Sequence, residues 1–437
     1  MLLFTTDISP RLRYILDFVG RELFDDPAGI GSTSDRRAFL SSQDARINYS
    51  DEDFEGVFTV RPAGLLVEQG IRQVPVRCIV AGGQKALFPT GGDFPFDIFA
   101  ASFYLLVRYE EYLPHPKDGY GRFAHTHSLA FREGFLDQPL VNAWLVEFKS
   151  ALAARYPGLS FRYPAFKFIP TYDIDSAYSY LYKGWKRNLG GLIKAFAAGR
   201  WARASGRIRV LLGRDKDPYD VYEWLDSLHL YCRMRPYYFF LAAAKQQGVD
   251  RNTPISGPGL QQLIRYHAAA SRIGVHPSWQ SGDREELLKE EIEWMSYVGG
   301  QEVFRSRQHF IRFSLPDTFR RLIRYGITQD FSMGYGSING FRASVASSFL
   351  WYDLEKETAT PLRLFPFCFM DANAYYEQRQ NATDTMRELL GYYHRIRKVN
   401  GLMVTIWHNS ILGNDPEFAG WRQAYETFLK EEVYWDM

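Results

Sequence analysis

The chain has 437 residues, which is more than one ordinary hydrophobic core accommodates, so its length predicts two domains. The net charge of +2 argues against a dedicated nucleic-acid-binding protein, which needs a strongly basic face. The three cysteines, Cys78, Cys232 and Cys368, are widely spaced and form no CxxC pair, which argues against a disulfide framework and a thiolate zinc site.

Residues 1–160 are predicted to form a mixed α/β domain, whose role the sequence does not indicate. Short β-branched runs predict strands, and apolar residues at helical spacing predict amphipathic helices. The strands are expected at 57–60 and 76–80, and the helices at 97–112 and 140–156. The N-terminus lacks the pattern of a secretory signal, and no run of 18 apolar residues predicts a transmembrane helix. We therefore expect a cytoplasmic protein.

Residues 161–437 alternate between predicted strands and helices. The strands are expected at 166–172, 237–241, 273–275, 328–331, 362–367 and 402–407. The helices are expected at 219–232, 260–271, 284–297, 316–325, 382–398 and 420–429. Such alternation indicates parallel strands joined by crossover helices, in a barrel or an open sheet. In a barrel the chemistry gathers at the carboxyl ends of the strands.

A basic insertion at 183–216 interrupts this alternation. It carries ten Lys or Arg residues against one acid, Asp215, and the cations are interleaved with aromatic and aliphatic residues. Such a segment can contact an anionic lipid surface or an acidic polymer, or close over a cleft. It can equally be a solvated helical excursion packed on the rest of the domain.

Residues suited to catalysis or metal binding follow several of the predicted strands. Asp173 and Asp175 are two positions apart, so both side chains lie on one face of a strand near its end. A close carboxylate pair beside an apolar strand is costly unless a cation or hydrogen bonds compensate it. Later strand ends add His276, Asp330 and His408, and Arg307 and His309 lie between the second and third of these four strand ends. Hard and borderline cations take carboxylate and imidazole ligands, so this series predicts a metal site.

The ordered series resembles the signature of the polysaccharide deacetylase family, also called NodB homology or carbohydrate esterase family four. The residues Thr171-Tyr172-Asp173-Ile174-Asp175 are similar to the family's first motif, with one residue between the aspartates. His276 resembles the first histidine of the second motif, and Arg307 the arginine of the third. Asp330 resembles the acidic fourth segment, and His408 the final histidine.

The resemblance covers residues 166–412 and implies a distorted (β/α) barrel, preceded here by the smaller N-terminal domain. Two departures stand out. Gln280 occupies the position of the family's second histidine, four residues after His276, and the Pro-Tyr of the third motif is missing. His309, two residues after Arg307, is the residue that could supply the missing ligand from the neighbouring strand end.

The resemblance implies a hydrolase that removes N- or O-acetyl groups from a carbohydrate. Asp175, His276 and His309 are the expected ligands of a divalent metal ion, with zinc favoured. Such an ion polarises the acyl carbonyl and lowers the pKa of its bound water.

The same resemblance implies acid–base roles for the remaining residues. Asp173 is the expected general base and Arg307 the residue that orients it. His408 is the expected general acid, because a histidine pKa of about 6.5 suits proton delivery near neutral pH. Asp330 is expected to orient His408 or hold its pKa.

Three other functions remain open from the sequence. The first is another amide hydrolase on the same barrel, acting on a small amide. The second is a metal-free glycoside hydrolase that uses Asp173 and Asp330 as its carboxylate pair. The third is a degenerate, non-catalytic carbohydrate-binding protein, an alternative that rests on Gln280.

Overall fold

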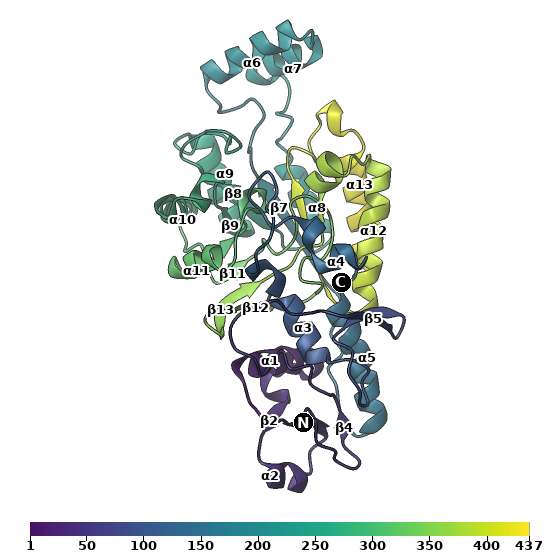
Figure 1. The fold of residues 1–437 in the computed structure, drawn as a ribbon. Coiled ribbons are helices and arrows are strands. Elements are labelled where there is room, and N and C mark those ends of the chain that lie inside the picture. Colours follow the sequence, from purple (N-terminus) through teal and green to yellow (C-terminus); the bar gives the residue numbers. More distant parts are fainter. Residues whose placement is uncertain (437) are drawn as a thin grey trace.

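The computed structural model describes residues 1–436 and shows a mixed α/β protein (Figure 1). The N-terminal region contains a four-stranded parallel sheet in the order β2-β1-β3-β4. Its strands are β1 (Leu2–Phe4), β2 (Gly31–Thr33), β3 (Arg46–Asn48) and β4 (Phe58–Thr59). A separate antiparallel hairpin joins β5 (Cys78–Ala81) to β6 (Gln84–Leu87).

Helices surround these strands. They are α1 (Pro10–Phe24), α2 (Arg36–Ser41), α3 (Ile98–Leu106), α4 (Leu129–Arg132) and α5 (Leu140–Arg155). Helix α2 contacts the four-stranded sheet, α3 and α5 contact the β5–β6 hairpin, and α1 packs on α3 and α5. The predicted helices at 97–112 and 140–156 correspond to α3 and α5, whereas α1 was not predicted. The sequence does carry a start signal for α1, because the Ser9 hydroxyl accepts a hydrogen bond from the Leu12 amide at 3.0 Å and Pro10 occupies the first turn.

The larger region is organised around a nine-stranded sheet in the order β12-β13-β11-β10-β9-β8-β7-β15-β14. All neighbours pair in parallel except β12 and β13, which form an antiparallel pair at one edge. The strands are β7 (Lys167–Ile174), β8 (Tyr237–Leu241), β9 (Arg272–His276), β10 (Arg305–Ser306), β11 (Gln329–Asp330), β12 (Phe349–Asp353), β13 (Thr358–Leu364), β14 (Phe369–Met370) and β15 (Leu402–His408). Strand β8 is buried along its whole length, which explains its continuous aromatic and aliphatic sequence.

The strand order has the sequential winding of an α/β barrel. The last strand, β15, pairs with the first strand of this region, β7, and β7 is followed in spatial order by β8, β9, β10 and β11. Within residues 1–436 no ladder joins β13 to β14, so closure of the barrel stays a prediction.

Crossover helices connect the parallel strands, as the alternation of elements predicts. They are α8 (Tyr222–Tyr231), α9 (Pro258–Ala270), α10 (Glu285–Gly299), α11 (Asp317–Arg324) and α12 (Ala382–Lys398), and a further helix, α13 (Trp421–Thr427), follows the last strand. In Figure 1 the group α9 to α11 lies on one side of the sheet and α12 and α13 on the other. The basic insertion forms two further helices, α6 (Trp185–Ala197) and α7 (Trp201–Leu211), at the end of the molecule opposite the N-terminal sheet.

Most buried apolar residues of the N-terminal region and of the larger sheet form one connected cluster, and a small separate cluster contains Phe4, Phe39, Phe54 and Val57. For example, Tyr14 of α1 packs against Tyr352 of β12 with ring centroids 4.9 Å apart, and its hydroxyl donates to the Leu350 carbonyl at 2.7 Å. The division into domains at residues 160 and 161 stays a prediction, and the two regions share a core.

Candidate metal centre

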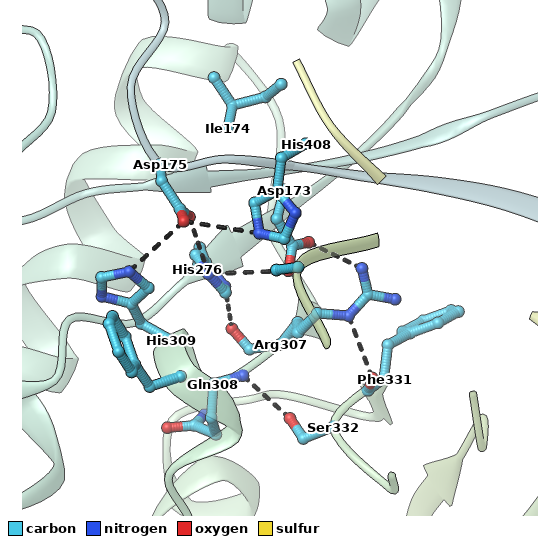
Figure 2. A network of polar contacts seen from close by, with 12 residues as sticks. Asp173, Ile174, Asp175, His276, Arg307, Gln308, His309, Phe331, Ser332 and His408 are labelled. Carbon is cyan, nitrogen blue, oxygen red and sulfur yellow. Dashed lines mark hydrogen bonds and ion pairs between the residues drawn. The ribbon is translucent and has the colours of Figure 1, made fainter. Parts of the chain in front are cut away.

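The predicted site residues meet at the carboxyl ends of neighbouring parallel strands. Asp173 and Asp175 lie at the end of β7, His408 at the end of β15 and His276 at the end of β9. The ladder places His408 directly opposite Asp173. Parallel strands end at one edge of a sheet, so residues far apart in the chain converge there (Figure 2).

The carboxylate of Asp175 is the centre of this arrangement (Figure 2). Its Oδ1 lies 3.2 Å from Nε2 of His276, and its Oδ2 lies 3.6 Å from Nε2 of both His309 and His408. One ligand atom each from Asp175, His276 and His309 can be chosen so that all three lie within 4.8 Å of one another. One ion can therefore reach all three, with one carboxylate and two imidazoles as donors.

The hydrogen bond of His276 decides which of its ring nitrogens can bind a cation. Nδ1–H donates to the Arg307 carbonyl at 2.5 Å, so in the neutral ring Nε2 carries the free lone pair. This lone pair faces Oδ1 of Asp175, which is buried and has no hydrogen-bond partner among residues 1–436. Two acceptors 3.2 Å apart repel each other unless a positive charge lies between them. The donor set therefore fits a divalent cation.

His309 is held in the same way by a residue that the sequence did not indicate. Its Nδ1 pairs with Oδ1 of Asp250 at 2.8 Å, so Nε2 points toward Asp175. Asp250 is itself fixed by the Trp279 amide at 2.8 Å and by the Gln280 side-chain amide, whose Nε2 donates at 3.0 Å. Gln280 thus supports the carboxylate of Asp250, which orients His309.

The charges around Asp175 shift several pKa values. Burial lowers the pKa of His309, but the carboxylates of Asp175 and Asp250 outweigh it and raise the pKa to about 9. Burial alone would raise the pKa of Asp175, and the surrounding imidazoles instead hold it well below its usual range, with His309 contributing most. In the absence of metal, His309 therefore holds a proton beside the ionised Asp175, and a bound cation would replace that proton.

Asp173 lies beside the cluster and is held by Arg307. Both side chains are buried, and Nη1 of Arg307 donates to Oδ1 of Asp173 at 2.7 Å. Nε of the same guanidinium donates to the Phe331 carbonyl at 3.1 Å, and the guanidinium carbon lies 4.4 Å from the centre of the Phe239 ring. Arg307 is thereby fixed on three sides, and it presents Asp173 to the cavity described below.

His408 is paired with Asp371, which follows β14. Nδ1–H of His408 donates to Oδ1 of Asp371 at 2.6 Å, and the His408 amide donates to Oδ2 at 2.7 Å. Burial lowers the pKa of His408, but Asp371 outweighs it and raises the pKa to about 10. The ring therefore keeps a proton on Nε2, which points toward Asp175.

The prediction that Asp330 orients His408 is wrong, because Asp371 occupies that position. Asp330 is fully buried and accepts hydrogen bonds from the Ser306 hydroxyl at 2.8 Å and the Ser332 amide at 2.8 Å. The Ser332 hydroxyl in turn accepts from the Gln308 amide at 2.9 Å, so Asp330 braces the segment that carries Arg307 and His309. Burial raises the pKa of Asp330 to about 6.

A cavity of about 380 Å³ opens over the cluster. Among the described residues that line it are Asp173, Asp175, His276, His309 and His408, but not Asp330. A metal-free hydrolase using Asp173 and Asp330 as a carboxylate pair would need both side chains in this cavity. The cavity volume falls within the range typical of small-molecule sites.

The N-terminal region also contributes to the cavity wall, through Tyr120 and Arg122. The Tyr120 ring lies 5.0 Å from the ring of Phe310, and Nη1 of Arg122 donates to the Phe310 carbonyl at 2.9 Å. Nε of Arg122 donates to Asp118 at 2.6 Å, which holds the guanidinium in place. Nothing in the sequence indicated this contact, since Tyr120 is some 190 residues from Phe310 and lies in a loop.

Comparison with known proteins gives one family match and several structural similarities. Residues 1–157 match a model described as a family of unknown function (DUF7033). No curated protein matches the sequence.

The solved structures with similar folds have low identity to this chain. A protein described as a polysaccharide deacetylase from Mycobacterium smegmatis has 14% identity and a TM-score of 0.40, and the match covers 63% of this chain and 86% of that one. An allantoinase has 14% identity and a TM-score of 0.36, covering 62% and 84%. A protein described as a polysaccharide deacetylase from Pseudomonas aeruginosa PAO1 has 12% identity and a TM-score of 0.39, covering 74% and 92%.

Proposed function

We propose that this protein is a metal-dependent hydrolase that removes acetyl groups from a carbohydrate, in the manner of a polysaccharide deacetylase. The observation that carries the proposal is the convergence of Asp175, His276 and His309, whose ligand atoms lie within 4.8 Å of one another at one edge of the sheet. A candidate base and a candidate acid adjoin this cluster, and both face the same cavity.

Asp175 and the Nε2 atoms of His276 and His309 would hold the ion. Two imidazoles and one carboxylate form a donor set typical of catalytic zinc sites, which keep a further position for water or substrate. When bound, a divalent ion supplies Lewis acidity, which polarises an acyl carbonyl and lowers the pKa of water. The carbonyl of Arg307 and the carboxylate of Asp250 fix the two rings in the required tautomer.

Asp173 and His408 would carry the proton transfers. Asp173, oriented by Arg307, accepts a proton from the attacking water while a new C–O bond forms at the acyl carbon. The bond from the acyl carbon to the sugar nitrogen or oxygen then breaks, and His408 donates its Nε2 proton to the leaving group. The products are acetate and the free amine or hydroxyl.

The metal site can be tested before a substrate is known. We expect close to one divalent ion per chain by mass spectrometry after reconstitution with Zn²⁺, and loss of the ion in Asp175→Ala, His276→Ala and His309→Ala. His394→Ala is the matched control, because His394 is an exposed histidine outside the cluster. A wild-type protein that binds no ion would overturn the metal-dependent mechanism.

Catalysis is tested by acetate release from acetylated amino sugars and acetylated oligosaccharides. We expect Asp173→Asn and His408→Ala to retain the ion and lose about 10²- to 10⁴-fold in kcat, because each removes one acid–base function. If the wild-type protein binds these sugars and the ion without releasing acetate, the protein is a carbohydrate-binding protein and the proposal is wrong.

The size of the cavity favours one further candidate, an amide hydrolase acting on a small molecule with the same residues. About 380 Å³ accommodates a compact ligand rather than a long stretch of polymer. The rate of hydrolysis as a function of chain length separates the two functions. Activity that rises with oligosaccharide length supports the deacetylase, and activity confined to small amides supports the alternative.

A further inference from the structure

The basic insertion forms a helical hairpin that stands away from the rest of the molecule (Figure 1). Helices α6 and α7 pack against each other, and their outer surface carries large apolar side chains. Trp185 is 71% exposed, Ile193 60% and Trp201 66%. Isolated exposed apolar residues are ordinary, but a cluster of them on one projecting element indicates an interaction surface.

The exposed apolar residues share one face of each helix. On α6, Trp185, Leu189, Ile193 and Phe196 follow at spacings of four, four and three, so they fall within one quarter of the helix circumference. The connection to α7 continues the stripe, because the rings of Phe196 and Trp201 are in contact with centroids 5.3 Å apart.

On α7 the stripe runs on from Trp201 to Ile208, seven residues later and therefore on the same side of the helix. The interior of the hairpin uses other, smaller residues: Asn188 and Ala195 of α6 and Ala204 and Val210 of α7 are buried. The apolar stripe is thus not needed to hold the two helices together.

The same hairpin is rich in cations. Residues 183–216 carry ten Lys or Arg and one acid, a net charge of +9, on a chain whose total is only +2. Within residues 1–436 no acidic side chain lies within ion-pair distance of Lys194, Arg200 or Arg214. A positive charge so concentrated on one projection attracts anionic surfaces.

The base of the hairpin is fixed to the strand end that carries Asp175. The Asp217 carboxylate accepts hydrogen bonds from the amides of Ser179, Tyr180 and Leu181 at 2.7 to 3.0 Å, which ties the two stems together. Nζ of Lys183 donates to the Ser176 hydroxyl at 2.8 Å. The projection is therefore held in place by its root.

We propose that the α6–α7 hairpin docks on an anionic lipid surface. The aliphatic and indole side chains of the stripe would enter the boundary between headgroups and acyl chains, and the cations of the hairpin would attract the anionic surface. No helix in the described part of the chain is long and apolar enough to span a bilayer, so the contact is interfacial. A lipid surface fits better than an acidic polymer, because a polyanion would engage the cations and leave Leu189 and Ile193 in water.

The proposal is tested with the full chain and sedimentation on vesicles of phosphatidylcholine, with or without phosphatidylglycerol. We expect binding to the anionic vesicles that weakens as salt is raised from about 0.05 to 0.5 M, and a blue shift of tryptophan emission. Trp185→Ser combined with Trp201→Ser should reduce the partition coefficient by about tenfold or more, because both side chains leave water on docking.

Leu230→Ser combined with Tyr297→Ser is the matched control, since both side chains are 82% exposed on other helices. It should bind vesicles like the wild type, and thermal unfolding should show that all variants are folded. Absence of wild-type binding at low salt overturns the proposal, as does unchanged binding of the double tryptophan variant. Binding to heparin without binding to anionic vesicles would also overturn it and identify the hairpin as a polyanion site.

Discussion

Two clusters in this molecule each place one carboxylate among several basic side chains, but they differ in how that carboxylate is hydrogen-bonded. In the first, Glu111 of the N-terminal region pairs with Arg108 and Arg342. One of its oxygens accepts from Nε of Arg108 at 2.7 Å and Nε of Arg342 at 2.8 Å, and the other accepts from Nη2 of Arg342 at 2.5 Å. Burial alone would raise the pKa of Glu111, but the two guanidinium groups lower it to about 2.

In the second cluster, Asp175 faces the ring nitrogens of His276, His309 and His408 at 3.2 to 3.6 Å, and one of its oxygens has no hydrogen-bond donor among residues 1–436. Each histidine is already tied to another acceptor through Nδ1. In the first network every carboxylate oxygen of Glu111 accepts a hydrogen bond from a guanidinium group, whereas in the second a buried oxygen of Asp175 has no hydrogen-bond partner among the described residues. The first joins two parts of the fold, and the second provides the donor set of the proposed metal site.

The largest effect on folding is expected from breaking the first cluster. Glu111→Gln leaves the buried guanidinium of Arg342 without a counter-charge, while Arg108 keeps Glu110. Removing one partner of a buried ion pair costs about 3–5 kcal/mol of the free energy of unfolding. Urea unfolding measures this. Glu293→Gln, which alters an exposed ion pair with Lys289, should leave stability unchanged within error. Equal stabilities of the two variants would contradict the structural role of the Glu111 cluster.

The same cluster predicts a pH dependence of stability. Because the folded-state pKa of Glu111 is lowered from 4.5 to about 2, the unfolded chain takes up this proton first. The stability that Glu111 contributes is therefore complete above about pH 4.5 and is lost as the pH falls toward 2. The free energy of unfolding, measured from about pH 6 down to about pH 2, should therefore fall less steeply in Glu111→Gln than in the wild type.

The next effect is the stabilisation of the folded chain by Zn²⁺, which should depend on the Asp175 cluster and not on the Glu111 cluster. Zn²⁺ at a free concentration of about 100 Kd should raise the free energy of unfolding by about 2.7 kcal/mol, because the ion binds the folded chain. Asp175→Asn should lose this gain, while Glu111→Gln, although less stable, should keep it. Thermal unfolding with Zn²⁺ and with chelator measures the difference. A gain retained in Asp175→Asn would mean that the ion binds elsewhere.

A smaller effect is expected from the residues that orient the ligands. Asp250→Asn weakens the hydrogen bond that fixes His309 and should reduce metal affinity by about 10- to 100-fold without abolishing binding. Gln280→Ala should have the same direction and a smaller size, because Gln280 acts on Asp250. Competition with a zinc-binding dye measures both affinities. Full retention of metal affinity in Asp250→Asn would show that Asp250 does not support the metal site.

The smallest effect concerns the N-terminal wall of the cavity. If Tyr120 contacts substrate without taking part in the chemistry, Tyr120→Ala should raise KM severalfold and leave kcat and metal content unchanged. Tyr297→Ala, at an exposed tyrosine remote from the cavity, is the control. A fall in kcat at unchanged KM would instead assign Tyr120 to the transition state.

Much of the secondary structure was predictable because its signal is local. The helix at 382–398 and the strand at 237–241 have the predicted bounds, since helical periodicity and a continuous apolar run are properties of neighbouring residues. The short strands β1, β10 and β14 were not predicted. Two or three residues show no period of their own, and their pairing with neighbours in the sheet defines them as strands.

The sequence by itself predicted that Asp173, Asp175, His276 and His408 stand at strand ends, and the structure brings them to one cavity together with His309. It did not determine how they pair. Asp371 lies 37 residues from His408, and Asp250 lies 59 residues from His309, so neither contact leaves a local pattern. Asp330 was given the place of Asp371 because it resembles the acidic fourth segment of the polysaccharide deacetylase signature. Only the order of strands in the sheet decides which carboxylate faces which ring. A hydrogen bond depends on a distance of about 3 Å in space, however far apart the two residues are in the sequence.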